Sequence, residues 1–147
     1  MIEQIKTLEQ VGTYLPYLVK AYRENRSLFE DNMSETDFIS RVFTHFKDES
    51  NLFFGRIAND RLEFFVCTAD LGYPKKDIKL VWFCYCDPHC HRYTYPWIDL
   101  CKEYCKARGI KELRFITNRL TRAYRRFANR IGGKVFLHSY KINLNNG

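Results

Sequence analysis

The sequence contains no apolar run of the roughly 18 residues that a membrane-spanning helix needs, and we predict no membrane association. Glycine and proline are scarce, with seven and four among 147 residues, which excludes collagen-like and low-complexity classes. Residues 1–6 show no basic segment followed by an apolar stretch, so we expect no secretory signal. No internal repeat or linker interrupts the chain, and its length fits a single domain over residues 1–147.

Aromatic residues are abundant: the chain has 12 Phe, 10 Tyr and 2 Trp within a hydrophobic share of 46%. Side chains of this size can fill a sizeable core, so disorder is excluded as a description of the whole chain.

Six cysteines raise the question of disulfides or metal, and five of them lie between residues 84 and 105. Without a secretory signal, we expect reduced thiols in a cytoplasmic protein. The alternative is a zinc site, because thiolates and imidazoles are zinc ligands. Its candidate ligands are Cys84, Cys86, His89, Cys90, His91, Cys101 and Cys105. The chain has no C-x₂-C pair, and the last two cysteines fall on the apolar stripe of a predicted helix, so we favour buried thiols and predict no metal.

Positive charge is concentrated in residues 101–134, which hold eleven Lys and Arg but two acidic residues, in a chain of net charge +7. Such a segment favours a phosphate-bearing partner, whether nucleotide, coenzyme or nucleic acid. The alternative is a solvated helix face that serves solubility.

Hydrophobic periodicity predicts the order of helices and strands. The predicted elements are a strand at 2–6, helices at 8–23 and 35–48, strands at 52–58, 62–69 and 79–86, a helix at 95–108, a strand at 112–117, a helix at 121–131 and an extended segment at 135–144. Ser34 followed by Asp37 is typical of a helix N-cap, and Asn59-Asp60 of a hairpin turn. Pro16 predicts an irregularity in the first helix.

This order predicts an α+β domain in α/β/α layers, with a mixed sheet of about six strands and four helices. The connection from the strand at 79–86 through a helix to the strand at 112–117 should be a parallel crossover. Such a change from antiparallel to parallel pairing opens a crevice at the carboxyl ends of the strands, where ligands often bind.

The order of elements resembles that of the GNAT superfamily of acyl-CoA-dependent N-acyltransferases, most closely over residues 80–136. The segment Arg126–Gly132 is similar to the family's closing helix, which ends in an apolar residue and Gly. The resemblance implies transfer of an acetyl or other acyl group from acetyl-CoA to an amine whose identity the sequence leaves open.

The turn before the third predicted helix departs from the family's Arg/Gln-x-x-Gly-x-Gly/Ala pattern, whose backbone N–H groups hold the coenzyme pyrophosphate. Alignment on Arg92 puts Tyr95 and Trp97 at the two small positions, and we expect their rings to crowd the usual phosphate approach. Arg92 could instead supply a charged contact. The coenzyme-binding residues that the resemblance implies are Cys84, Cys86, Arg92, Tyr93, Thr94, Tyr95 and Asn118.

Attack of an amine on a thioester needs a base and a donor for the departing thiolate. The candidate bases are Glu63, on the third strand, and Asp70, at its end. Many family members have a Tyr acid four residues before the closing-helix Gly; here that position is Ala128, and Tyr124 lies one turn earlier on the same face. The alternatives are a solvated strand position for Glu63 and a packing role for Tyr124.

Within the superfamily, the chain is most similar to small phage-encoded members, such as the GNAT-like internal virion proteins of short-tailed phages. That resemblance implies an alternative function: a catalytically silent basic protein that contacts nucleic acid or a virion component, in the host cytoplasm or the particle. A basic stripe can follow a phosphate backbone without reading sequence. Its residues are Arg119, Arg122, Arg126 and Arg130.

Overall fold

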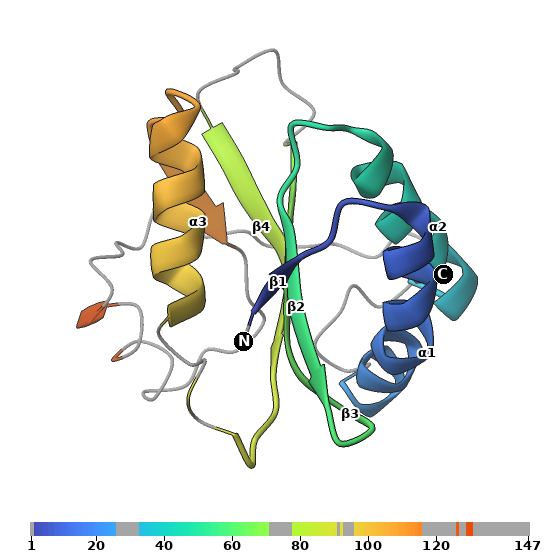
Figure 1. The fold of residues 1–147 in the computed structure, drawn as a ribbon. Coiled ribbons are helices and arrows are strands. Elements are labelled where there is room, and N and C mark those ends of the chain that lie inside the picture. The colour runs from blue at the N-terminus through green and yellow to red at the C-terminus, as the bar shows by residue number, and fades with distance from the viewer. Residues whose placement is uncertain are drawn as a thin grey trace, which may run out of the picture.

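The computed structural model describes residues 2–25, 33–70, 78–90, 92, 96–115, 126 and 129–130. Its elements are β1 (Glu3–Gln4), α1 (Leu8–Glu24), α2 (Glu35–Lys47), β2 (Phe53–Ala58), β3 (Arg61–Ala69), β4 (Ile78–Cys86), α3 (Pro96–Ala107) and β5 (Glu112–Phe115). The strands form one sheet in the order β1-β2-β3-β4-β5. Helices α1 and α2 cover one face and α3 covers the other, which confirms the predicted α/β/α layers (Figure 1).

The described part of the chain holds five strands and three helices, against the predicted six and four. The difference arises because the predicted helix at 121–131 lies almost wholly, and the predicted segment at 135–144 wholly, outside the described residues. The other predicted elements are present, with ends that differ from the predictions by a few residues.

Both N-terminal helices begin with a capping box, in which a side-chain oxygen and a backbone N–H satisfy each other's hydrogen bonds. Thr7 and Gln10 form the box of α1, and Ser34 and Asp37 form that of α2, as predicted. Helix α1 runs through Pro16 as one element. Its buried face, which includes Leu18, is held against the sheet, so packing overrides the unfavourable propensity of proline.

The sheet is antiparallel from β1 to β4 and parallel between β4 and β5, so the predicted change of pairing is confirmed. The β2–β3 turn places Asn59 and Asp60 at φ 53° and 57°. Two successive left-handed residues match the twist of a tight hairpin, and Asn and Asp tolerate that conformation better than other non-glycine residues.

Two apolar clusters lie on opposite faces of the sheet. The cluster under α1 and α2 contains Phe38, whose ring stacks on Trp82 at 5.6 Å between centroids. The cluster under α3 contains Phe64 and Val66 from β3, together with Trp97 and Cys101 from α3. Because both faces are packed, a ligand can reach β4 only where its neighbouring strand stops pairing with it.

Candidate functional site

The middle of β4 carries a β-bulge. In its pairing with β3, Cys67 lies opposite Phe83 and Thr68 lies opposite Val81, which leaves Trp82 as an extra residue. A bulge bends its strand and interrupts the ladder of hydrogen bonds, and bulges are common beside active sites. This bulge divides β4 into a first half, which ends at Val81, and a second half, which ends at Cys86.

Strand β5 pairs with the first half of β4. Parallel pairing with β5 joins Ile78–Val81 to Glu112–Phe115, and Phe115 is the last residue of this segment that the structure describes. Within the described residues, the second half of β4 pairs with β3 alone. The change from antiparallel to parallel pairing at β4 marks the place where the topology predicts a ligand crevice.

Helix α3 follows the second half of β4 and begins at Pro96, a residue that suits the first helical position because it needs no N–H partner. Arg92, an exposed residue, precedes it in the connecting turn. Trp97 is 6% exposed and packs in the cluster between α3 and the sheet. Its ring is therefore a core element, a role that the periodicity of Trp97, Ile98 and Cys101 explains, while Tyr95 lies outside the described residues.

Two thiols occupy the second half of β4. Cys84 lies opposite Val66 and Cys86 opposite Phe64, so both face the α3 side of the sheet, and both are half-buried. Their side chains hydrogen-bond to each other: this bond, with burial, raises the pKa of Cys84 well above its usual value, and it lowers the pKa of Cys86 against the opposing effect of burial.

All six cysteines are free thiols in the structure. Among the described residues, no three His, Cys, Asp or Glu side chains form a group that could hold a metal ion. His91, one of the zinc-ligand candidates, lies outside that part of the chain.

Glu63 lies at the same end of the sheet as Cys86. It is the extra residue of a second bulge, where Arg56 pairs with Phe64 and Ile57 with Leu62. Its carboxylate is 3.8 Å from Arg56 Nε, and its Oε2 is buried without a hydrogen-bond partner among the described residues. The Asp87 N–H donates to the Glu63 carbonyl at 2.9 Å, which ties the end of β4 to this bulge.

Asp87 is buried, and its carboxylate forms a 2.8 Å ion pair with Arg61, so the chain direction just after β4 is fixed. The second half of β4 therefore has the Trp82 bulge at one end, carries the Cys84 and Cys86 thiols, and ends close to Glu63.

No protein-family profile and no curated protein sequence matches this chain. Solved structures do match. A predicted acetyltransferase from Clostridium acetobutylicum, crystallised with acetyl-CoA, superposes with a TM-score of 0.69 at 12% identity, over 100% of this chain and 99% of that one. A ribosomal-protein-alanine N-acetyltransferase from Brucella melitensis gives 0.64 at 18% identity, over 98% and 99%. An aminoglycoside 6'-N-acetyltransferase from Acinetobacter haemolyticus gives 0.62 at 13% identity, over 97% and 99%.

This chain has the GNAT fold. The predicted fold class and resemblance are confirmed at the level of architecture, since identities this low establish the fold alone.

Asp70, the second candidate base, lies at the far end of β4 in this GNAT fold. It forms a 2.5 Å ion pair with the buried Lys79 ammonium, which also donates to Ser50 Oγ at 2.8 Å and Asn51 Oδ1 at 3.0 Å. The network joins the α2–β2 loop to β3 and β4. The structure therefore brings Glu63, and not Asp70, to the end of the sheet where the thiols lie.

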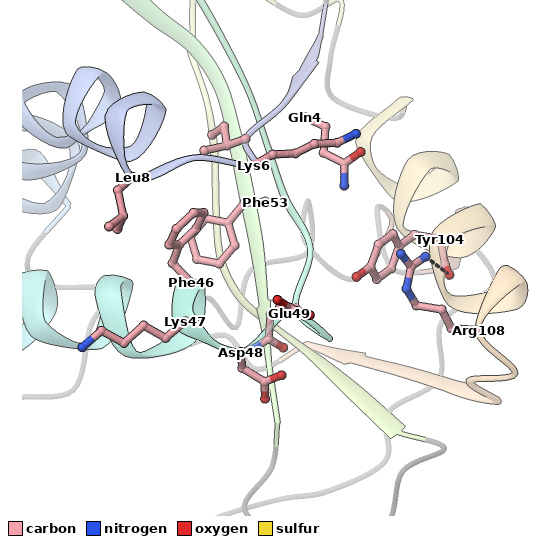
Figure 2. Close-up of a pocket in the computed structure, with 12 residues that line it drawn as sticks. Gln4, Lys6, Leu8, Phe46, Lys47, Asp48, Glu49, Phe53, Tyr104 and Arg108 are labelled. Atoms are coloured by element: carbon pink, nitrogen blue, oxygen red, sulfur yellow. Dashed lines mark hydrogen bonds between the residues drawn. The ribbon is translucent and has the colours of Figure 1, made fainter.

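A cavity of about 450 Å³, which the sequence did not predict, lies at the other end of α3 from Pro96. Figure 2 shows Tyr104 and Arg108 on one side of it and Phe46 and Lys47 on the other. The Arg108 guanidinium lies 3.5 Å from the centroid of the Tyr104 ring. The i, i+4 spacing of Tyr104 and Arg108 indicates that the two side chains are neighbours. Only the packing shows that they border a cavity. None of the predicted site residues lines it.

Several predicted residues lie outside the described part of the chain: Tyr93, Thr94, Tyr95, Asn118, Arg119, Arg122 and Tyr124. Arg126 and Arg130 are described and exposed. None of the described helices is long and apolar enough to cross a membrane.

Proposed function

We propose that this protein is a GNAT-type N-acyltransferase that transfers an acetyl group from acetyl-CoA to an amine. The observation that carries the proposal is the change from antiparallel β3–β4 to parallel β4–β5 pairing, with the Trp82 bulge in β4 and α3 as the next helix along the chain. The similar structures support it, because one of them is an acetyltransferase crystallised with acetyl-CoA and two others are named as N-acetyltransferases.

In this proposal, Arg92 and the backbone N–H groups at the start of α3 bind the coenzyme phosphates, since a helix N-terminus favours anions. The second half of β4 lines the pantetheine path, with Cys84 and Cys86 along it. Residues 93–95 and Asn118 complete the predicted binding set.

Glu63 is the proposed base. A neutral amine is needed for attack on the thioester, so a carboxylate must accept the proton that the amine loses. The position of Glu63 suits this role, because its buried Oε2 has no hydrogen-bond partner among the described residues and lies 3.8 Å from Arg56 Nε. As the new N–C bond forms, the C–S bond breaks, and Tyr124 is the predicted donor of a proton to the leaving thiolate.

Calorimetry with acetyl-CoA tests the proposal. We expect micromolar binding that weakens at least about tenfold, a loss of roughly 1.4 kcal/mol, when Arg92→Ala removes the phosphate contact. Arg23→Ala is the matched control, because this exposed arginine pairs with Glu35 on the far side of the sheet. Absence of heat up to millimolar acetyl-CoA would refute the proposal.

The buried ring of Trp97, at a position where the family pattern has a small residue, favours a second candidate: a GNAT-fold protein without catalysis that binds a polyanion. Exposed Arg126 and Arg130 suit contact with nucleic acid or a virion component. This function predicts that DNA retention falls steeply between low and moderate salt and that Arg126→Ala weakens it, while acetyl-CoA gives no heat. Retention that is unchanged by salt and by this substitution would exclude it.

A further inference from the structure

The cavity of about 450 Å³ beside α3 lies away from the proposed acetyl-CoA site. Helix α3 begins at Pro96, whereas the cavity contacts its other end, at Tyr104 and Arg108. The remaining walls come from the β1–α1 connection and the α2–β2 loop (Figure 2). Small-molecule sites typically have volumes of roughly 300–1,000 Å³, so this cavity has room for a ligand of its own.

Hydrogen bonds hold the walls of this cavity in place. The Tyr104 hydroxyl donates to the Ser50 carbonyl at 3.2 Å, which ties α3 to the α2–β2 loop. Within that loop, Asp48 Oδ1 accepts from Ser50 N at 2.9 Å and from Ser50 Oγ at 2.7 Å. The cavity is therefore preformed, and a ligand would not have to order its walls.

Part of the lining is apolar. Phe46, which is half-buried, packs edge-to-face on the buried Phe53 ring at 5.5 Å between centroids. Leu8, which also lines the cavity, is 63% exposed and stands out among the described residues as an exposed large apolar side chain. An apolar group placed here would remove these surfaces from water, which is favourable.

Charges of both signs line the cavity. Lys6 and Arg108 lie on the β1 and α3 sides, and Asp48 and Glu49 lie on the α2 side (Figure 2). Lys47, the third cation of the lining, extends away from α3. None of these five side chains forms an ion pair with another described residue. Two positive and two negative groups are thus available to a ligand.

The Arg108 guanidinium is held by its face, because its carbon lies 3.5 Å from the centroid of the Tyr104 ring. Stacking leaves most of the N–H groups, which lie in the guanidinium plane, to bind a planar acceptor such as a carboxylate. One of them donates to the Tyr104 carbonyl at 3.5 Å. On the opposite wall, hydrogen bonds from Ser50 lower the pKa of Asp48, so this carboxylate stays charged and favours a cation.

We propose that this cavity binds a free α-amino acid with a large apolar side chain. The carboxylate of the ligand lies toward Lys6 and Arg108, its ammonium toward Asp48 and Glu49, and its side chain against Phe46. A simple anion would meet two carboxylates here and a simple cation two basic groups, whereas a zwitterion complements both walls. The site is separate from the proposed function, because no predicted coenzyme-binding or catalytic residue lines the cavity.

Calorimetry of the full-length protein with L-phenylalanine, in the absence of acetyl-CoA so that no transfer can occur, tests the proposal. We expect saturable binding with a dissociation constant below about 1 mM. Two analogues each lack one charge: 3-phenylpropionate has no ammonium, and phenethylamine has no carboxylate. Both should bind at least about tenfold more weakly than L-phenylalanine, because one charged wall is left without its partner. L-alanine, which lacks the apolar group, should also bind at least about tenfold more weakly.

Substitutions assign the binding to this cavity. Arg108→Met and Glu49→Gln each remove one charge with little change in side-chain length, and each should weaken L-phenylalanine binding by at least about fivefold. Lys106→Met and Glu103→Gln are the matched controls, because both residues are exposed on α3 and neither lines the cavity. They should leave the affinity unchanged. All four residues are exposed, so each variant should fold, which urea unfolding checks.

Three outcomes would overturn the proposal. The first is no binding of L-phenylalanine up to about 10 mM. The second is equal affinity for either analogue with a single charge, which would indicate a site for a simple ion. The third is an unchanged affinity in Arg108→Met or in Glu49→Gln, which would show that the amino acid binds elsewhere on the protein.

Discussion

Replacement of Trp97 by alanine should destabilise this protein strongly, because the structure places its ring in the core between α3 and the sheet. The residue is 6% exposed and belongs to a cluster with Phe64, Val66 and Cys101. Sequence comparison with the family pattern places the same ring in the coenzyme turn, so the two interpretations predict different outcomes for one substitution.

The magnitude follows from the buried area. A tryptophan buries roughly 150–250 Å². At about 25 cal/mol per Å², this corresponds to roughly 4–6 kcal/mol of transfer free energy. Alanine retains a part of it, so we expect Trp97→Ala to lower the free energy of unfolding by about 3–5 kcal/mol. That is a large share of the roughly 5–15 kcal/mol typical of a domain, so the variant should fold marginally.

Urea unfolding followed by fluorescence measures this loss. The chain has two tryptophans, so Trp97→Ala leaves Trp82, in the cluster on the other face of the sheet, as the probe. Trp97→Phe should cost less, because it keeps a ring in the same space. Leu8→Ala is the surface control: Leu8 is 63% exposed, and we expect a change within about 0.5 kcal/mol.

A loss below about 1 kcal/mol for Trp97→Ala, accompanied by tighter acetyl-CoA binding, would refute this reasoning. It would show that the ring lies at the mouth of the crevice and obstructs it.

Three further predictions concern the framework. Gly55→Ala should lower the free energy of unfolding in urea by about 1–3 kcal/mol, because a Cβ there would lie 2.5 Å from Cε1 of the buried Tyr14 ring. Gly12→Ala should instead raise it by about 0.5–1 kcal/mol, because a Cβ at this helical position would have nothing within 4 Å. Equal effects of the two substitutions would contradict this explanation. Burial, with the nearby arginine on α2, lowers the pKa of His45. The contribution of His45 to stability is therefore present above about pH 6.5 and is lost as the pH falls through the folded-state pKa. His45→Gln should flatten this part of the plot of stability against pH, and an unchanged plot would argue against this role. Lys79→Met should lower the free energy of unfolding by about 2–3 kcal/mol, because three acceptors lose a buried donor. The loss is no larger because the Asp70 carboxylate is half exposed and can be hydrated. An unchanged stability would show that the network does not stabilise the fold.

Signals between near neighbours predicted most of the described fold. The Ser34–Asp37 capping box starts α2, and Asn59-Asp60 turns the β2–β3 hairpin, because the groups that satisfy each bond are a few residues apart. Alternation along β4 placed Cys84 and Cys86 on one face for the same reason. Pro16 predicted an irregularity, yet α1 is continuous, because packing against the sheet outweighs local propensity.

The candidate site was predictable only in part. The change from antiparallel to parallel pairing follows from the order of elements, and with it the expectation of a crevice beside β4. The position of the Trp82 bulge does not follow from that order, because it depends on how β3 pairs with β4. Both Glu63 and Asp70 are candidate bases from the sequence, and only the structure shows that the Asp70 carboxylate pairs with Lys79.

The sequence by itself determined the layers, the helix starts, the hairpin and the shared face of the two thiols on β4, since each depends on residues close together in the chain. Tertiary structure alone decided where the bulge in β4 lies, that Trp97 belongs to the core, and that Asp70 pairs with the buried Lys79. These properties depend on contacts between segments far apart in the chain, and periodicity within one segment carries no information about them.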